Sequence, residues 1–422
     1  MRQCVPILAA ACCLPESAAI PPLPETAAFI RDRRTWAAYL LLGLFAYLET
    51  TIGPAMPFLR SELGLGYAVA SLHFSAFAAG AVGVGLTGER WVRRVGRHWS
   101  LWGGLGGMTA GGLLIAFSPS VIGTILGALV MGMFGTLSLM ANQAILSDLH
   151  GAQRTIALTE SNVVATSAAV TAPLLIGGFA AMGLGWQTAL MLPVPCAALL
   201  WWIFRGVRFP QSPPLENGHA SGHRLPAAFW MLCLVLFLVA AVEWCMAYWG
   251  ADFLASVVGL DRAAAATAMT LFFVAMAGGR FIGSRLARRY HSVSLLLAAI
   301  GVALCGFLVF WLAPAPAPSL VGLFLAGLGI ANFYPLTVAA ATGAASHLVD
   351  QATARLAVAG GLALLTAPLA VGALSDAAGM RWGFGIVAPL LMLAFVGLLA
   401  THWLTPRAKA PTTVSALPPA SS

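Results

Sequence analysis

Charged residues are scarce in this chain. Asp, Glu, Lys and Arg make up only 9% of its 422 residues, whereas hydrophobic residues make up 60%. A soluble domain usually carries about a quarter charged residues, so this chain lacks the polar side chains needed to cover a globule in water. The mean hydropathy of +0.88 agrees. The composition excludes a soluble protein and indicates one embedded in a lipid bilayer.

Cysteine and histidine are also scarce, and they are not grouped. The chain has 7 Cys and 8 His, and the Cys residues show no spacing typical of a metal site. No apolar run contains a pair of His, and no glycine-rich loop follows a strand as phosphate-binding loops do. We therefore expect no cofactor, no metal and no enzymatic activity.

Long apolar runs are what the chain has in quantity. A helix needs roughly 20 apolar residues to cross a bilayer, and twelve runs meet that length. They are continuous rather than alternating, which is typical of helices and not of barrel strands. The predicted spans are 36–59, 68–88, 98–118, 120–141, 156–181, 186–205, 228–254, 264–284, 292–312, 319–341, 354–375 and 382–404.

The chain repeats itself. A short basic segment at 88–97 returns 195 residues later at 283–291, so that Gly88 falls on Gly283 and Arg94 on Arg289. One register holds over most of the chain, which indicates two copies of one unit. The sequence therefore predicts an all-α membrane protein whose 12 transmembrane helices form two pseudo-symmetric six-helix bundles. The expected parts are a disordered tail at 1–35, bundles at 36–205 and 227–404, a linker at 206–226 and a tail at 405–422.

The positive charges are distributed unevenly. Of the 22 Lys and Arg, only Arg60, Arg262 and Arg381 fall on the odd-numbered loops, and the others lie at the termini, in the even-numbered loops or at the adjoining span ends. By the positive-inside rule, both termini, the linker and both basic segments are cytoplasmic. We expect a multi-pass protein of the cell inner membrane. The net charge of +8 is read as this topology signal and not as nucleic-acid binding.

Two glutamates lie deep in equivalent spans. Glu49 is near the middle of the first span and Glu243 near the middle of the seventh, and the repeat aligns them within one residue. Helical spacing puts Gly53 on the face of Glu49, and Ala247 on that of Glu243. A charge at that depth costs several kcal/mol unless it faces water or a partner. The sequence predicts one wet cavity between the halves, with both glutamates in proton coupling.

A third carboxylate has an opposite charge as its repeat mate. Glu160 in the fifth span corresponds to Arg355 in the eleventh. Either these charges take part in an ion pair that holds one conformation, or they form a charged rim where an anion or a proton docks. Both alternatives stay open, and Glu160 is the third candidate for proton coupling.

Further polar and aromatic residues fall inside the spans. Pro335 predicts a bend in the tenth span that faces the substrate. Asp252, Asp376 and Arg381 are expected near the outer interface, without a role in the cavity. The residues expected to line the substrate cavity are Asn142, Gln143, Asn162, Trp244, Tyr248, Asn332, Tyr334 and Arg355.

The basic segments resemble the signature Gly-x-x-x-Asp-Arg-x-Gly-Arg-Lys/Arg of the major facilitator superfamily. Arg94-Val95-Gly96-Arg97-His98 matches its second half. The chain departs from the signature at its Asp position. That position is Arg93 when the signature is aligned from Gly96, and Glu89 when it is aligned from Gly85. In the second copy Ser284 stands there. The resemblance implies that these segments gate the transporter, through Gly88, Glu89, Arg93, Arg94, Gly96, Arg97, Gly283, Arg285, Arg288 and Arg289.

The same resemblance implies a secondary transporter that works by alternating access, as a monomer, on a small organic solute. Ala172-Pro173 followed by Gly177-Gly178 is similar to the helix 5 motif of drug–proton antiporters, which favours efflux. Glu49 is similar to the helix 1 acid of fucose-permease-like symporters, which favours uptake. We expect proton-coupled efflux, with a sugar-like symporter or a proton-independent uniporter as alternatives. An enzyme or a receptor on this scaffold is a distant alternative.

Overall fold

The structure is a computed structural model that describes residues 29–210, 225–345 and 348–404. Most of the expected N-terminal tail, the middle of the linker and the whole C-terminal tail lie outside these residues. The predictions made for those three segments are therefore outside the described structure.

Each predicted span corresponds to one helix or to two consecutive helices within the described residues. The unbroken helices are α1 (Arg33–Leu63), α2 (Tyr67–Val95), α3 (Arg97–Phe117), α4 (Val121–His150), α5 (Arg154–Ala181), α8 (Ala227–Ser256), α9 (Arg262–Leu286), α10 (Ser292–Leu312) and α13 (Val349–Ala378). The broken ones are α6 (Gln187–Met191) with α7 (Pro193–Phe204), α11 (Pro316–Ile330) with α12 (Phe333–Ala344), and α14 (Met380–Phe384) with α15 (Val387–Leu404).

By length and hydropathy, 11 helical stretches in the described residues are able to cross a membrane. One of them, Val121–Ala181, is 61 residues long and contains both α4 and α5, joined only by a 3-10 turn at Gly151–Gln153. It is about twice the length that one span requires. The eleven stretches therefore account for the twelve predicted spans.

The helix breaks have local causes. Pro193 is the first residue of α7, where its missing N–H costs nothing. The break between α11 and α12 falls at Ala331 and Asn332, and Pro335 lies in the first turn of α12. The bend predicted at Pro335 is therefore present, and it lies just ahead of the proline because the ring obstructs the preceding turn.

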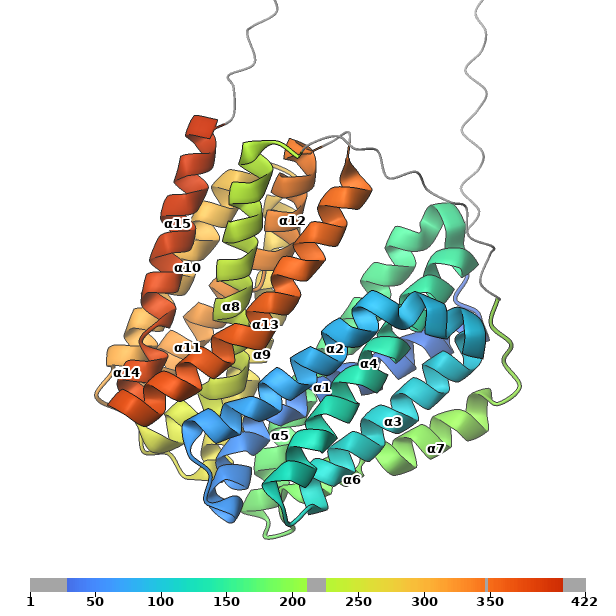
Figure 1. Ribbon diagram of the computed structural model, residues 1–422, viewed down its shortest axis with the longest axis horizontal. Coiled ribbons are helices and arrows are strands. Elements are labelled where there is room, and N and C mark those ends of the chain that lie inside the picture. The colour runs from blue at the N-terminus through green and yellow to red at the C-terminus, as the bar shows by residue number, and fades with distance from the viewer. Residues whose placement is uncertain (1–28, 211–224, 346–347, 405–422) are drawn as a thin grey trace, which may run out of the picture.

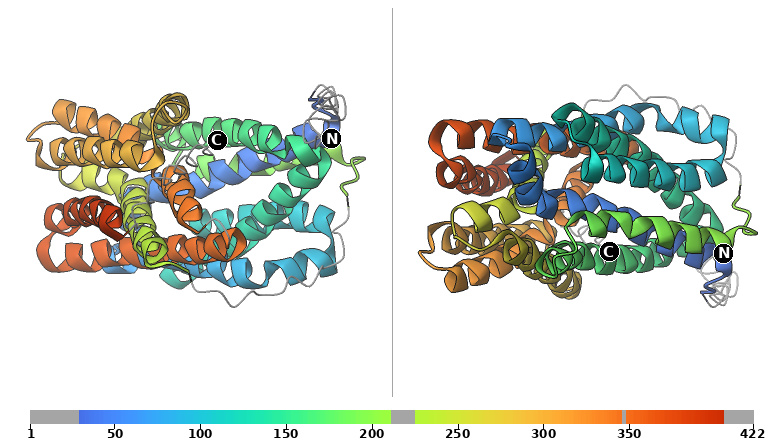
Figure 2. Two further views of the ribbon diagram at one scale, coloured as in Figure 1. Left: turned by 90° about the horizontal axis from the view of Figure 1, so that it is seen from above. Right: turned by 90° about the horizontal axis from the view of Figure 1, so that it is seen from below.

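The two halves lie side by side and meet mainly through three helix pairs. Figure 1 shows α1–α7 on one side and α8–α15 on the other, diverging toward the end where α8 begins and α15 ends; Figure 2 shows the same two groups from above and below. The main pairs between the halves are α1 with α8, α2 with α13 and α5 with α9, and α1 also contacts α9. Exchanging the halves turns the α2–α13 pair into the α9–α5 pair, as the repeat requires.

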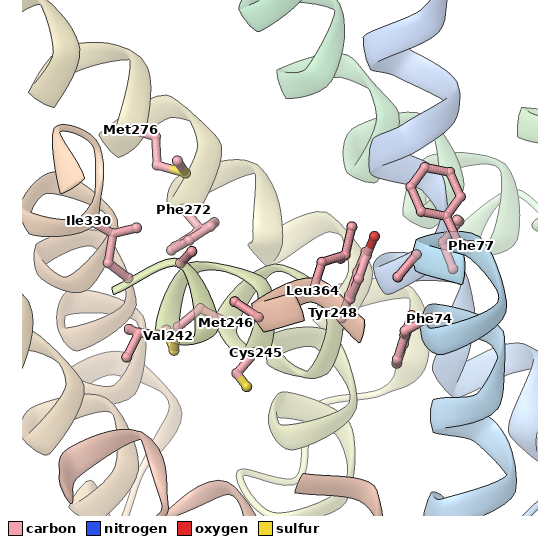
Figure 3. Close-up of a cluster of buried hydrophobic side chains, with 14 of the residues drawn as sticks. Phe74, Phe77, Val242, Cys245, Met246, Tyr248, Phe272, Met276, Ile330 and Leu364 are labelled. Carbon is pink, nitrogen blue, oxygen red and sulfur yellow. The ribbon is translucent and has the colours of Figure 1, made fainter. Parts of the chain in front are cut away.

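An apolar cluster joins the halves at their meeting point. Phe74 and Phe77 of α2 lie beside Tyr248 of α8 and Leu364 of α13, and all four side chains are buried (Figure 3). No charge is buried among these four side chains, and the hydroxyl of Tyr248 is their only polar group, so burial of their apolar surface holds the halves together.

The first basic segment is not the loop that the sequence indicated. Helix α2 continues to Val95, and only Gly96, with φ +86°, separates it from α3. The apolar run ends at residue 88 because the charges begin there, yet Glu and Arg are good helix formers and the backbone continues. In the second copy, α9 ends at Leu286 and a turn leads to α10 at Ser292.

Candidate functional site

A cavity of about 310 Å³ lies between the two halves. It is lined by α1, α4 and α5 from the first half and by α8 and α9 from the second. Six of the residues predicted to act at the site are brought together here: Glu49, Gln143, Asn162, Glu243, Trp244 and Tyr248.

The crossing of α1 and α8 places the two glutamates. Gly53 packs against the backbone of Ala247 and Tyr248, so closely that a Cβ on Gly53 would overlap the Ala247 carbonyl oxygen. Glu49 and Glu243 each lie four residues, about one helical turn, before this contact. Both are half-buried, line the cavity and are close enough for their charges to interact. The geometry is that of a carboxylate pair beside a tight helix crossing.

The same cavity is lined by a cation, Arg280, which was expected to lie at the end of a span. The guanidinium of Arg280 on α9 reaches the Thr166 hydroxyl (Nη1 to Oγ1, 3.3 Å) and the Ala331 carbonyl (Nε to O, 3.4 Å). It is close enough to Glu243 for their charges to attract. The sequence contained one signal for this role. The repeat mate of Arg280 is Gly85, so the duplication alone does not explain a charge at this position.

Aromatic rings form the wall on the side of the crossing. Tyr248 stacks on Phe74 with 4.2 Å between ring centroids and 6° between planes, and Trp244 lies 5.3 Å from Tyr248. Within the described residues the Tyr248 hydroxyl has no hydrogen-bond partner although it is buried. An unpaired buried hydroxyl costs roughly 1–3 kcal/mol, so a hydrogen-bond partner for this group would be favourable.

Four of the predicted cavity residues lie elsewhere. Asn142 is buried and donates to the Ala38 carbonyl (2.7 Å), which ties α4 to α1. Asn332 donates to the Gly279 carbonyl (2.7 Å) and packs on Gly283 of α9. Tyr334 and Arg355 are exposed and are not among the residues that line the cavity, although Tyr334 is close enough to Glu243 for the charge of that carboxylate to act on its hydroxyl. These four residues were predicted to line the cavity because they are polar, whereas the packing of the helices decides where their side chains point.

Glu160 also lies away from the cavity. It accepts hydrogen bonds from Arg31 (Nε to Oε2, 2.9 Å) and from the Tyr39 hydroxyl (3.2 Å). The hydrogen bond to Glu160, together with the charge of that carboxylate, raises the pKa of the Arg31 guanidinium. Of the two alternatives for Glu160, the structure shows an ion pair within the first half, and Arg355 is not its partner.

Polar contacts join the two halves on the side of the cavity opposite to the basic segments. Arg60 pairs with Asp252 (Nη1 to Oδ1, 2.6 Å) and lies over the Tyr67 ring, 3.6 Å from its centroid. Asp376 of α13 accepts from the backbone N–H groups of Tyr67 and Ala68 at 2.7 and 2.9 Å. Asp252 and Asp376 were expected to be merely interfacial, but they join the two halves.

The two basic segments have different surroundings. In the first copy Arg97 is buried and pairs with Asp148 at the end of α4 (2.7 Å), while Glu89 and Arg93 are 3.8 Å apart. In the second copy Arg285 lies over the Phe281 ring, 4.8 Å from its centroid, and the remaining basic side chains are exposed. Gly88 packs against Met140, and Gly283 against Asn332, so both glycines allow close helix contact.

A family model described as Major Facilitator Superfamily matches residues 36–322 and 232–421. Among curated proteins, an uncharacterised MFS-type transporter of Yersinia pestis is 27% identical over 161 residues, covering 38% of this chain and 41% of that protein. The enterobactin exporter EntS of Shigella flexneri is 33% identical over 146 residues, covering 33% of this chain and 35% of the exporter. The matched stretch is thus less than half the length of either relative.

Solved structures share the fold over nearly their whole length. A bacterial homologue of the human lysosomal transporter Spinster, in an inward-facing and occupied conformation, superposes with a TM-score of 0.73 at 16% identity, covering 88% of this chain and 96% of that one. The peptide transporter POT gives a TM-score of 0.71 at 15% identity, covering 88% and 94%. At these identities the likeness is one of fold.

Proposed function

The chain belongs to the major facilitator superfamily and is a multi-pass secondary transporter rather than an enzyme, and from this premise we propose that it exports a small organic solute in exchange for protons. The observation that carries the proposal is the Glu49–Glu243 pair, which faces the cavity one turn from the α1–α8 crossing. Two carboxylates near enough for their charges to interact repel each other unless at least one is protonated or neutralised.

The arrangement of contacts supports a direction of opening. With the basic segments on the cytoplasmic side, the Arg60–Asp252 pair and the Asp376 contacts close the outer side, and the cavity is accessible from the cytoplasm. In alternating access the two bundles rock about a site near the middle of the membrane. Breaking the outer contacts would open the cavity outward, where protons bind the glutamates and release the solute.

The cavity chemistry supports a solute with both polar and ring-shaped parts. Gln143 and Asn162 present amides, and Trp244 and Tyr248 present ring faces on which a planar group can stack. The enterobactin exporters matched over part of the chain add support for efflux of a siderophore-like solute.

Arg280 favours a second candidate, the uptake of an anionic solute together with a proton. When Glu243 is ionised it neutralises part of the Arg280 charge. Protonation of Glu243 would free the guanidinium for an anion, so proton and solute would bind together rather than compete. The two candidates differ in the direction in which a pH gradient drives the solute.

The test is transport in inside-out vesicles with a pH gradient of either sign, with labelled enterobactin as the first probe. Exchange predicts accumulation only when the lumen is acidic. Glu49→Gln and Glu243→Gln should each lower gradient-driven accumulation by about tenfold or more, equivalent to ~1.4 kcal/mol of coupling.

Glu62→Gln is the matched control, because Glu62 accepts from Trp186 (2.7 Å) and Gln187 (3.2 Å) outside the cavity. Undiminished gradient dependence in both cavity variants would refute the assignment of coupling to this pair. Accumulation that requires an acidic exterior would instead support the symport candidate.

A further inference from the structure

A second cavity, of about 810 Å³, lies where the end of α2, the start of α3 and the chain after α7 meet. It is separate from the transport cavity and lies on the side of the basic segments. Five arginines line it: Arg93, Arg94, Arg97, Arg205 and Arg208. Two come from just after α7, which the family signature does not include.

The positive charge of this cavity is only partly neutralised. Arg97 pairs with Asp148 at 2.7 Å, and Arg93 lies 3.8 Å from the exposed Glu89. In the part of the chain that the structure describes, Arg94, Arg205 and Arg208 have no carboxylate within ion-pairing distance. Several like charges gathered around one hollow repel one another unless an anion sits between them.

The start of α3 and the side chain of Arg97 lie at the same hollow. Helix α3 begins at Arg97, and its N-cap residue Gly96 offers no side chain to the free N–H groups of the first turn. Such a helix start attracts an anion. Independently, the Nε of Arg97 is buried without a hydrogen-bond partner among the described residues, although the side chain is only 6% exposed. A buried donor left unpaired is costly, and Arg97, which carries it, lines the cavity.

An aromatic wall borders the arginines. The His98 ring lies 5.7 Å from Trp99, 5.9 Å from Trp201 and 6.0 Å from Phe209, measured between centroids. Trp99, which lines the cavity, is 61% exposed. Exposed Trp residues gather at the level of lipid headgroups. The cavity therefore presents guanidinium groups at the headgroup level and ring faces toward the acyl chains.

We propose that this cavity binds the phosphate of an anionic phospholipid from the leaflet on the side of the basic segments. Arginines in a hollow at that leaflet are suited to phosphate because each guanidinium can donate two parallel hydrogen bonds. The apolar wall favours a lipid over free phosphate. The bound headgroup bridges the α2–α3 junction and the end of α7, and so stabilises the first bundle.

Thermal unfolding of the purified full chain in detergent tests this, with added phosphatidylglycerol, phosphatidylcholine or inorganic phosphate. Phosphatidylglycerol should raise the melting temperature of the wild type, and the other two should not. In the double variant Arg205→Gln, Arg208→Gln, the phosphatidylglycerol concentration for half the effect should rise about 25-fold, because each basic residue contributes about fivefold.

The matched control is Arg288→Gln, Arg289→Gln, which removes the same charge from exposed residues of the second copy. It should keep the wild-type response, and Arg205→Lys, Arg208→Lys should keep most of it. An unchanged response in the Arg205–Arg208 glutamine variant, or an equal loss in the control, overturns the proposal. An equal shift with inorganic phosphate overturns the assignment to lipid.

Native mass spectrometry of the wild type gives a readout that does not depend on any variant folding. The protein should retain phosphatidylglycerol in preference to phosphatidylcholine at equal concentration. Equal retention of the two lipids contradicts the proposal.

Discussion

The starts of α2 and α9 are equivalent positions in the two halves, and they are capped differently. Helix α9 is capped by its own Asp261, which accepts from the Ala264 N–H at 2.9 Å. The equivalent residue of α2 is Gly66, 195 positions earlier, and it provides no side chain. Asp376 from the other half takes that role. At this position the two copies differ, and the difference creates a contact between the halves.

The cavity also combines a feature that both halves share with one that a single half contributes. Each half contributes a glutamate, but the cation Arg280 comes from the second half alone, and its counterpart in the first half is Gly85. A cavity whose charged groups are distributed unequally suits a solute whose own charge or polarity is unequally distributed. Four experiments separate the shared features from those that one half contributes, beginning with the largest expected effect.

Arg280→Gln should lower transport of the solute by about tenfold or more, because it removes the guanidinium that lines the cavity and faces Glu243. Transport at several solute concentrations in reconstituted vesicles gives the measurement. Arg154→Gln is the control, since Arg154 is an exposed residue outside both the cavity and the basic segments. Equal transport by the two variants would remove Arg280 from the site.

Gly53→Ala should destabilise the protein by about 1–3 kcal/mol. The added methyl group would overlap the backbone carbonyl of Ala247, which cannot move as a flexible side chain could. The reciprocal change Ala247→Gly should cost no more than about 1 kcal/mol, through helix propensity. Denaturant unfolding of both variants measures the difference. Equal costs would show that the α1–α8 crossing tolerates widening.

Arg97→Gln should destabilise the first bundle by about 1 kcal/mol, since Arg97 is buried while its partner Asp148 is 41% exposed. The counterparts in the second half are Ser292 and Gly343, so that bundle has no such pair to lose. A double-mutant cycle with Asp148→Asn, followed by thermal unfolding, measures the coupling. Additive effects would mean that the ion pair contributes nothing to stability.

Asp376→Ala and Asp261→Ala each remove a helix cap, at a cost of about 1 kcal/mol. Only Asp376 bridges the halves, so only its loss should shift the conformational equilibrium, by about fivefold toward opening on the outer side. Distances between spin labels on the outer ends of α2 and α13 report the shift. A similar shift in Asp261→Ala would show that a cap donated by the other half has no special effect on the conformational equilibrium.

The sequence alone determined the twelve spans, their duplication and the meeting of Glu49 with Glu243. Run length and repeat offset are properties of the chain itself, and two carboxylates too costly to face lipid have few other places to lie. The bend before Pro335 was predictable for the same local reason.

Only the tertiary structure decided which polar side chains face the cavity. A helix that is apolar on every side carries no periodic signal of its inward face, so Asn142 and Asn332, which tie helices together, resemble Gln143 and Asn162, which line the cavity. Arg280 belongs to the site because α9 packs against α8 and α5. Such contacts join residues far apart in the chain, and their partners are set by packing rather than by spacing.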